Sequence, residues 1–440
     1  MESLTPIWAV PFIGLLLSIA ILPMAVPRFW HRHYGTVSLA WMAVLLLPMA
    51  FAFGAIQAGH LILDSLIRDY LPFIVAVGSL YAIGGGIRLT RTPSGLPASN
   101  TALLALGTLL AGLIGTTGAA IVLIRPLLRA IAWRREQTHV VIFFIFLVGN
   151  VGGALTPIGP PLFLGYLHGV GFAWTLQHLA LPVLFMSVLL LVVFWLIDRH
   201  YARREASPPM RLSHAGGPLL EGAINLVLLL AVVAVVVVSG SVTTGIAVPI
   251  GPVVLTLEEA LRVAGMFVLG LASMWLTPRG VRELNEFNWA AMREVALLFV
   301  GLFLTLAPLV AMLQAKHDGP FAPALALLND EAGQPRIAAY FWITGLLSSV
   351  LDNAPTYLVF FEAAGGDAVQ LQGKLARVLT ALSAGACFMG AMTYIGNAPN
   401  FMVRSIAEAR GVAMPSFFAF LGWSCAVLLP AFVLLTFVFF

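Results

Sequence analysis

The chain has 440 residues, of which 60% are hydrophobic and 10% are charged, and its mean hydropathy is +0.98. About a quarter of the residues in soluble domains are charged, so this composition excludes an ordinary soluble protein and predicts an integral membrane protein. The formal net charge of +4 comes from short clusters between apolar runs, which is typical of membrane topology signals and not of nucleic-acid binding. Cys387 and Cys425 both lie in apolar stretches, so we expect neither a disulfide framework nor a cysteine metal site.

Three membrane spans are predicted first, because roughly 20 apolar residues cross the hydrocarbon core of a bilayer. They cover residues 7–25, 36–56 and 70–87. Residues 1–6 contain no basic group, so the first run is expected to be a retained span and not a cleaved signal peptide. Arg28 and Arg32 follow the first span, and Arg88 and Arg91 follow the third. Basic loops prefer the cytoplasm, which predicts a periplasmic N-terminus in a bacterial cytoplasmic membrane.

The next apolar run, residues 99–131, is interrupted by Gly-Thr-Thr-Gly at 115–118. Arg88 precedes it and an arginine cluster at 125–135 follows it, so both of its ends are expected on the cytoplasmic side. This pattern predicts a re-entrant hairpin. The alternative is a single span over residues 103–123 with an ordinary glycine-containing turn of helix.

Residues 138–168 are too long for one simple span, and the glycines at 152–153 with the prolines at 157–161 divide them into two half-helices. A break of this kind must be packed in protein or line a cavity, because lipid cannot satisfy its backbone groups. A span at 176–197 follows and leads to the basic linker 199–218, which is expected in the cytoplasm.

The second half of the chain repeats this order of elements. Its predicted parts are three spans at 219–238, 259–276 and 294–314, a hairpin at 336–363 broken at Asp352-Asn353, a broken span at 373–406 and a final span at 416–438. The segment Gly390-Ala-Met-Thr-Tyr-Ile-Gly396 shares five of seven residues with Gly153-Ala-Leu-Thr-Pro-Ile-Gly159. Residues 1–198 and 219–440 are therefore predicted to be two repeats, each with five spans, one of them broken, plus a re-entrant hairpin. Five crossings are an odd number, so the two repeats are expected to have opposite orientations in the membrane, with a periplasmic C-terminus. The predicted fold class is therefore an all-α polytopic membrane protein with inverted-topology repeats.

The breaks carry small oxygen and amide ligands. Where a helix stops inside the membrane, its free carbonyl groups suit small cations and its free N–H groups suit anions. Hard cations such as sodium prefer oxygen ligands, so sodium is the expected ion. The candidate substrate- and ion-binding residues are Thr116, Thr117, Asn150, Thr156, Asp352, Asn353, Thr356, Thr393, Asn397 and Asn400.

Asp352 is singled out because a carboxylate at this depth is costly and by default marks an ion or proton path. Its alternative role is to cap the return helix of the hairpin. Burial favours the neutral carboxyl and a bound cation favours the carboxylate, so proton and sodium can compete for it. Asp352 is therefore the predicted proton-coupling residue.

Other polar residues have simpler explanations. Threonines within helices usually bond to a carbonyl one turn earlier, which is the expectation for Thr108, Thr305 and Thr380. Asn397 and Asn400 are open between capping a half-helix and contacting the substrate. Arg125 is expected to extend to the cytoplasmic headgroups, with attraction of an anion as the alternative. Three histidines are expected at the membrane interfaces: His139, His168 and His178.

The breaks also support a family resemblance. The chain resembles the ion transporter superfamily, which includes divalent-anion:sodium symporters, arsenite permeases and NhaD-type sodium:proton antiporters, and it is most similar to a bacterial branch of citrate transporters or sodium:proton antiporters. The residues that carry the resemblance are Gly152-Gly-Ala-Leu-Thr-Pro-Ile-Gly159, Asp352-Asn-Ala-Pro-Thr356 and Thr393-Tyr-Ile-Gly-Asn-Ala-Pro-Asn400. The resemblance implies a homodimer with a scaffold part and a moving transport part, as in elevator-type carriers. It also implies sodium at Thr117 with Thr156 and at Asn353 with Thr393.

The sequence predicts a secondary transporter and not an enzyme, since it has no nucleotide-binding P-loop, metalloenzyme histidine spacing or nucleophile elbow. Sodium/proton antiport through Asp352 is the leading hypothesis. Sodium- or proton-coupled transport of citrate or a dicarboxylate, efflux of arsenite, and a channel remain open as alternatives. No cofactor is expected beyond the coupling sodium or proton, and no nucleic-acid partner; the lipid bilayer is the expected surrounding.

Overall fold

The computed structural model describes residues 4–90, 93–205, 220–315, 319–330 and 333–440. Within these ranges, nine helices are long and apolar enough to cross a membrane, so the chain is an all-α polytopic membrane protein. The predicted linker 199–218 lies largely outside the described residues, as do Arg91 and the first three residues. The predicted start of the linker at residue 199 is wrong, because Arg199 belongs to the last turn of a long helix.

The first half consists of helices joined mostly by short turns. Its elements are a 3₁₀ turn Pro6–Ala9, α1 Val10–Ala25, α2 Pro27–Phe53, α3 Ala55–Asp64, a π-helical turn Ser65–Tyr70, α4 Leu71–Gly84, β1 Arg88–Leu89, α5 Pro97–Ile131, α6 Thr138–Leu147, the 3₁₀ turn η3 Val151–Ala154, α7 Pro160–Leu167 and α8 Phe172–Ala202.

The second half follows a similar order. Its elements are β2 Leu220–Glu221, α9 Ile224–Ser241, β3 Ala247–Ile250, β4 Val253–Thr256, α10 Leu257–Leu276, α11 Arg279–Leu284, α12 Ala290–Gln314, α13 Ala322–Ala326, α14 Ile337–Ser348, α15 Asn353–Ala363, α16 Ala368–Gln372, α17 Ala376–Met389, the 3₁₀ turn η5 Gly390–Met392, α18 Ala398–Ala409 and α19 Phe417–Phe439.

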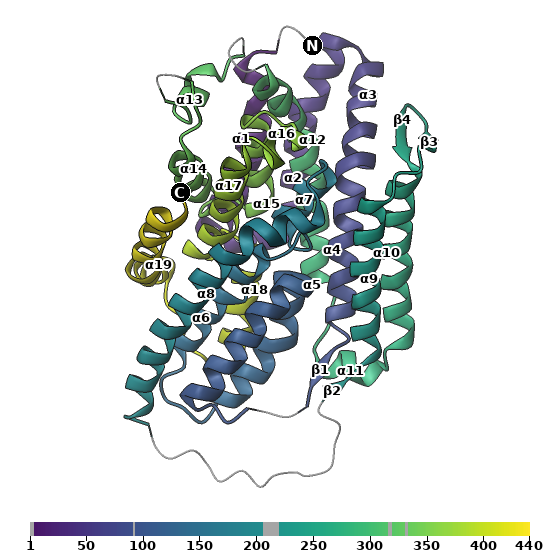
Figure 1. The fold of residues 1–440 in the computed structure, drawn as a ribbon. Coiled ribbons are helices and arrows are strands. Elements are labelled where there is room, and N and C mark those ends of the chain that lie inside the picture. The colour runs from purple at the N-terminus through teal and green to yellow at the C-terminus, as the bar shows by residue number, and fades with distance from the viewer. Residues whose placement is uncertain (1–3, 91–92, 206–219, 316–318, 331–332) are drawn as a thin grey trace.

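Two antiparallel strand pairs, β1 with β2 and β3 with β4, were not expected from the sequence. Figure 1 shows β1, β2 and α11 at one end of the molecule, and α13, α16 and the β3–β4 pair at the other. The pair β1–β2 joins the segment after α4 to the segment before α9, and Arg88 reinforces it with an ion pair of 2.8 Å to Glu221. These short strands fasten connections and leave the membrane part helical.

The boundary between the predicted second and third spans is wrong. The second span was expected to end near residue 56 and the third to begin near residue 70, but α2 ends at Phe53 and helical backbone then continues from Ala55 to Gly84. The acidic and basic residues of this region do not break the helix, because Arg68 pairs with Asp64 at 2.8 Å one turn away. The π-helical turn Ser65–Tyr70 absorbs the irregularity without ending the helix.

Helix α5 reverses its direction at Gly115. This residue has φ +75°, which is unfavourable for any residue with a Cβ atom, and it divides α5 into two arms. A straight helix of 35 residues would separate its ends by about 50 Å. Instead, Nε1 of Trp133 donates to the carbonyl of Ser94 at 3.2 Å, so the segments that flank the two arms meet. The geometry favours the predicted hairpin over a straight span; that both ends lie on one side of the membrane stays a prediction.

The long helices pack in two groups, and the shorter helices pack with one another and beside α5. α1, α2 and α12 pack together, and α4, α10 and α9 pack side by side, as Figure 1 shows for the last three. α14 packs on α17, α15 on α7, and α5 on the turn η3. α6 is buried from His139 to Leu147, in contrast to α2, where residues such as Phe51 are exposed. The short interrupted segments are thus enclosed by protein, as backbone breaks at membrane depth require.

His139, which was expected at a membrane interface, is enclosed by protein. Its Nε2 is 2.8 Å from Oδ1 of Asp198, and Nη1 of Arg134 is 2.5 Å from the same oxygen. Asn100 donates to the other carboxylate oxygen at 3.0 Å. All four side chains are buried. The sequence could not reveal this cluster, because its members come from the regions of α5, α6 and α8 and meet only in the folded protein. A buried charge is tolerated when such partners surround it.

Candidate functional site

Two interrupted segments form the base of the site. The first stops at Leu147 and resumes at Pro160, with η3 between, and the second stops at Met389 and resumes at Ala398, with η5 between. Proline occupies one of the first two positions of each resuming helix, where its missing N–H would have no helical partner. Both predicted breaks are confirmed.

Thr156 and Thr393 make matching hydrogen bonds in these breaks. The Thr156 hydroxyl donates to the carbonyl of Gly112, and the Thr393 hydroxyl donates to the carbonyl of Ser349 at 2.5 Å. Each acceptor lies 44 residues before its donor, in the hairpin that precedes the break. Each hydroxyl also accepts from the N–H two residues later, at 3.3 Å for Thr156 and 3.2 Å for Thr393. Each threonine therefore hydrogen-bonds the break in which it lies to the pair of helical arms that precedes it in the chain.

Three buried asparagines join the two breaks to each other. Nδ2 of Asn150 donates to Oδ1 of Asn400 at 2.8 Å, and Nδ2 of Asn397 donates to Oδ1 of Asn150 at 3.2 Å. Nδ2 of Asn400 donates to the carbonyls of Gly390 and Thr393, both at 2.8 Å. Segments about 250 residues apart in the chain thus share one polar centre.

Asp352 occupies the tip between α14 and α15. Its carboxylate accepts from the N–H of Ala354 at 3.2 Å, so the alternative role, capping of α15, is present in the structure. The N–H of Ala398, at the start of α18, interacts with the same carboxylate. Asp352 also lines a cavity, so it contacts solvent space as well as two helix N-termini.

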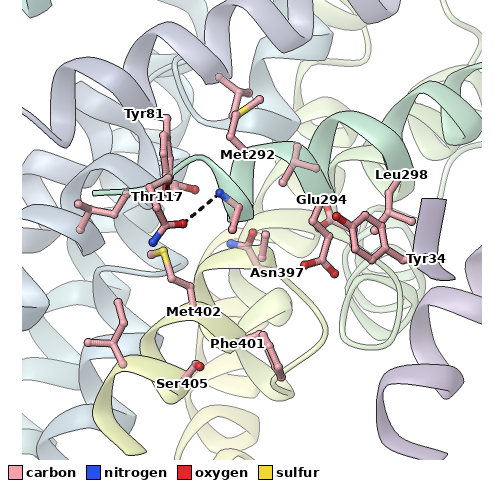
Figure 2. Close-up of a pocket in the computed structure, with 18 of the residues that line it drawn as sticks. Tyr34, Tyr81, Thr117, Met292, Glu294, Leu298, Asn397, Phe401, Met402 and Ser405 are labelled. Atoms are coloured by element: carbon pink, nitrogen blue, oxygen red, sulfur yellow. Dashed lines mark hydrogen bonds between the residues drawn. The ribbon is translucent and has the colours of Figure 1, made fainter. Parts of the chain in front are cut away.

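The cavity that Asp352 lines has a volume of about 530 Å³. Thr117 reaches it from α5 and Asn397 from the second break. Figure 2 shows these two residues at the cavity with Glu294 nearby and with Phe401, Met402 and Ser405 along α18. Much of the remaining wall is apolar, with residues such as Val77, Ile121, Leu298 and Phe299. A small polar base in an apolar chamber is typical of a site for a small solute or ion.

Two buried oxygens at the hairpin tips have no hydrogen-bond partner among the described residues. They are Oγ1 of Thr116 and Oδ1 of Asn353. Buried polar atoms are nearly always bonded, so such atoms indicate a missing ligand or water. The amide oxygen of Asn353, next to Asp352 in the chain, is a ligand of the kind that hard cations prefer. In the described part of the chain, no group of three or more His, Cys, Asp or Glu side chains is arranged to hold a metal ion.

The remaining predicted residues separate by position. Thr356 does not reach the polar cavity: its hydroxyl donates to the Asp352 carbonyl at 2.9 Å, and it lines a second, apolar cavity of about 390 Å³. Asn397 stands at the N-cap position of α18 but makes no side-chain capping bond, because its amide donates to the Gly149 carbonyl at 2.8 Å. The packing role expected for three other threonines is confirmed, with hydroxyls bonded one turn back: Thr108, Thr305 and Thr380.

Sequence reasoning did not predict the ion pairs beside the cavity, although attraction of an anion was the alternative role for Arg125. Nη2 of Arg125 is 3.3 Å from Oε2 of Glu286, and Nη2 of Arg410 is 2.9 Å from Oε1. Arg125 does not extend to headgroups as expected, because its residue is only 7% exposed and it lines the cavity. Burial acts to raise the pKa of Glu286, but the positive charges of Arg125 and Arg410 outweigh it and hold that pKa below its ordinary value.

A second missed acid is Glu294, which lies in the first turns of α12 and lines the same cavity. Nε1 of Trp30 donates to its Oε1 at 3.3 Å. Its signal in the sequence was weak but present, because an acid at the start of an apolar run costs free energy unless it has a partner or reaches water.

Long apolar helices around a cavity, with two interrupted helices meeting at its base, define a membrane transporter. The family model described as "Putative citrate transport" matches residues 1–440. The chain therefore belongs to this citrate transport family, within the ion transporter superfamily. This family description supports a membrane transporter. Among curated proteins, none matches the chain.

Proposed function

We propose that this protein is a cation-coupled secondary transporter in which Asp352 binds the coupling cation. The observation that carries this proposal is the position of Asp352, a carboxylate at a hairpin tip that lines the cavity. Ionisable groups at such depth are rare in membrane proteins and commonly mark an ion or proton path. The unpartnered oxygen of the adjacent Asn353 supports a cation there.

The transport mechanism we propose is alternating access between two inverted repeats, residues 1–198 and 219–440. The matching bonds of Thr156 and Thr393, each to a carbonyl 44 residues earlier, support two copies of one structural unit. The hairpins and breaks are bonded to one another and would move together as an elevator-type transport part. The homodimer implied by the resemblance belongs to the same proposal.

The leading form of this function is sodium/proton antiport. In one state the Asp352 carboxyl holds a proton; in the other its carboxylate, with Asn353 and Thr393, would hold sodium. Thr117 and Thr156, with the unpartnered oxygen of Thr116, would contribute to a second sodium site. Because a proton and sodium exclude each other at Asp352, loading one releases the other.

Proton flux in proteoliposomes tests the antiport. A sodium gradient should drive proton movement, read by an internal pH dye, and Asp352→Asn should lower the initial rate at least tenfold, since an amide cannot exchange a proton. Asp367→Asn is the matched control, because Asp367 also caps a helix but lies outside the cavity. Full sodium-dependent proton movement in the Asp352→Asn variant would refute the antiport.

The second candidate is cation-coupled transport of a carboxylate of the citrate class. The family description favours it. In addition, α7 and α18 both begin at the breaks, where free N–H groups attract anions. Uptake of labelled citrate into vesicles with and without an inward sodium gradient tests this candidate. Citrate uptake that requires the ion gradient supports it, and its absence with intact proton flux leaves antiport alone.

A further inference from the structure

A three-residue ion cluster lies at the edge of the cavity, where two of its members, Arg125 and Glu286, line the wall. It consists of Arg125 from α5, Arg410 at the end of α18 and Glu286, which follows α11. The side chain of Glu286 is 59% exposed and that of Arg125 is 8% exposed, so the cluster extends from open solvent into the wall. One carboxylate thus receives two arginines that come from the hairpin and from the second interrupted segment.

Glu286 is held in an unusual backbone conformation. Its φ is +50°, and it is the only non-glycine residue with positive φ in the described ranges. Such a conformation costs free energy and persists only where surrounding contacts impose it, most often at functional sites. Here it places the carboxylate between the two guanidinium groups.

Arg125 has more binding capacity than Glu286 uses. Its Nη2 pairs with Glu286, but its Nε is buried with no hydrogen-bond partner among the described residues. The same side chain lines the cavity. A guanidinium group normally binds a carboxylate through two parallel N–H bonds, so a single contact leaves part of its donor edge unused.

Further positive charge lies near Arg125 and Arg410. Arg129 lies one turn further along α5, within electrostatic reach of Arg88, Arg125 and Arg410. Such a group of cations raises the local concentration of anions at the cavity opening. Glu286 therefore stands at a position where a free carboxylate would also be attracted.

We propose that Arg125 and Arg410 form a carboxylate-binding site at the opening of the cavity, occupied here by Glu286 and accessible to a substrate carboxylate that displaces it. The site adds a recognition step to the carboxylate transport proposed above and depends on that candidate. Glu286 acts as an internal competitor, and replacing its carboxylate by one substrate carboxylate leaves the net charge around the two arginines unchanged.

Citrate binding to the purified protein tests this site, with affinity measured calorimetrically at fixed sodium concentration and ionic strength. If Glu286 competes with the substrate, Glu286→Gln should tighten citrate binding about two- to fivefold, as expected for loss of an exposed ion pair. If Glu286 only ties elements together, the same variant should leave the affinity unchanged or weaken it. The sign of the change separates the two.

The arginines should respond in the opposite direction. Arg125→Gln should weaken citrate binding about tenfold or more, because a charged hydrogen-bond donor is lost. Arg410→Gln should weaken it less; its side chain is 39% exposed, so this variant is expected to fold even if Arg125→Gln does not. The matched control is Glu408→Gln, which removes an acid paired with Arg404 at 2.9 Å on α18 and outside the cavity.

Two results would overturn the site. One is a citrate affinity that does not change in Glu286→Gln and Arg410→Gln, and the other is the absence of citrate binding in the wild type and all variants alike. The proposed cation function is read separately in the same preparations, as a sodium-dependent thermal shift that Asp352→Asn removes. A sodium shift that persists without citrate binding rejects the carboxylate site and keeps the cation site. Citrate binding without a sodium shift rejects the cation site instead.

Discussion

The side-chain amide of Asn150 donates a hydrogen bond of 2.8 Å to Oδ1 of Asn400, which joins one interrupted segment directly to the other. Asn150 also donates to the Ile145 carbonyl at 2.8 Å, one of the carbonyls left free where α6 stops. The Asn150 amide thus gives a free carbonyl of α6 a hydrogen-bond donor and connects the first interrupted segment to the second. Both asparagines are at most 1% exposed, so water does not replace these bonds.

Asn150→Ala should therefore destabilise the protein. It leaves Oδ1 of Asn400 and the Ile145 carbonyl without this donor, at a cost of about 1–3 kcal/mol for each buried unsatisfied group. Thermal unfolding in detergent should show a clearly lower midpoint. Asn329→Ala is the control, because its amide is only partly buried and bonds the carbonyl of Leu325, in the preceding helix α13, at 3.2 Å. Equal midpoints in the two variants would contradict a joining role for Asn150.

The hydroxyls of Thr156 and Thr393 should be needed for the response to sodium. Thr393→Val keeps the shape but removes a donor to Ser349 and an acceptor for the N–H groups of Ile395 and Gly396. We expect a loss of about 1–3 kcal/mol in stability, together with loss of the thermal shift produced by sodium. Thr156→Val should behave alike.

The control for both threonine variants is Thr305→Val. The Thr305 hydroxyl is equally buried but bonds only carbonyls of its own helix in the described structure, Gly301 at 2.7 Å and Leu302 at 3.3 Å. A carbonyl one turn back already has a helical partner, so this variant should lose less than about 1 kcal/mol and keep the sodium shift. A sodium shift retained in Thr393→Val would remove that threonine from the proposed cation site.

The sequence predicted the breaks because their signals are local. Glycine at 153 and 390 together with proline at 160 and 399 disfavours a continuous helix, and no distant residue is needed to see this. Asp352 was found for the same reason, since a lone carboxylate in an apolar run is unusual by itself. The fold class followed from hydrophobicity alone.

The charged partners could not be predicted, because each depends on contacts made only in three dimensions. Arg125 and Glu286 are 161 residues apart, and Glu286 lies in a short connection without any motif. Arg134 looked like a topology signal among other arginines, yet it is fully enclosed with Asp198. A basic residue near a span end reads the same in the sequence whether it faces headgroups or a buried acid.

Gly115→Ala should weaken the reversal of α5. At φ +75° and ψ 156°, a conformation that essentially only glycine adopts, an L-residue costs about 1–3 kcal/mol, so the unfolding midpoint should fall. Gly422→Ala, in the exposed part of α19, should have the opposite sign, because a Cβ there meets no atom within 4 Å and alanine favours a helix interior by about 0.5–1 kcal/mol. A stabilised Gly115→Ala variant would show that α5 does not need this conformation.

The ion pairs of Glu286 predict how stability changes with pH. The folded-state pKa of Glu286 is lowered, so its contribution is fully present above its unfolded value of about 4.3 and is lost as pH falls through the folded value. Because the side chain is 59% exposed, solvent screens the pairs and the contribution should stay below about 1 kcal/mol. Wild type should therefore unfold at a slightly higher temperature than Glu286→Gln at neutral pH, and the two midpoints should converge in acid. Raising the salt to about 0.5 M should narrow the difference at neutral pH, because exposed charges are then screened within a few ångströms. A difference that grows as the pH falls would mean that Glu286 is stabilised as a neutral acid, which two guanidinium partners cannot explain.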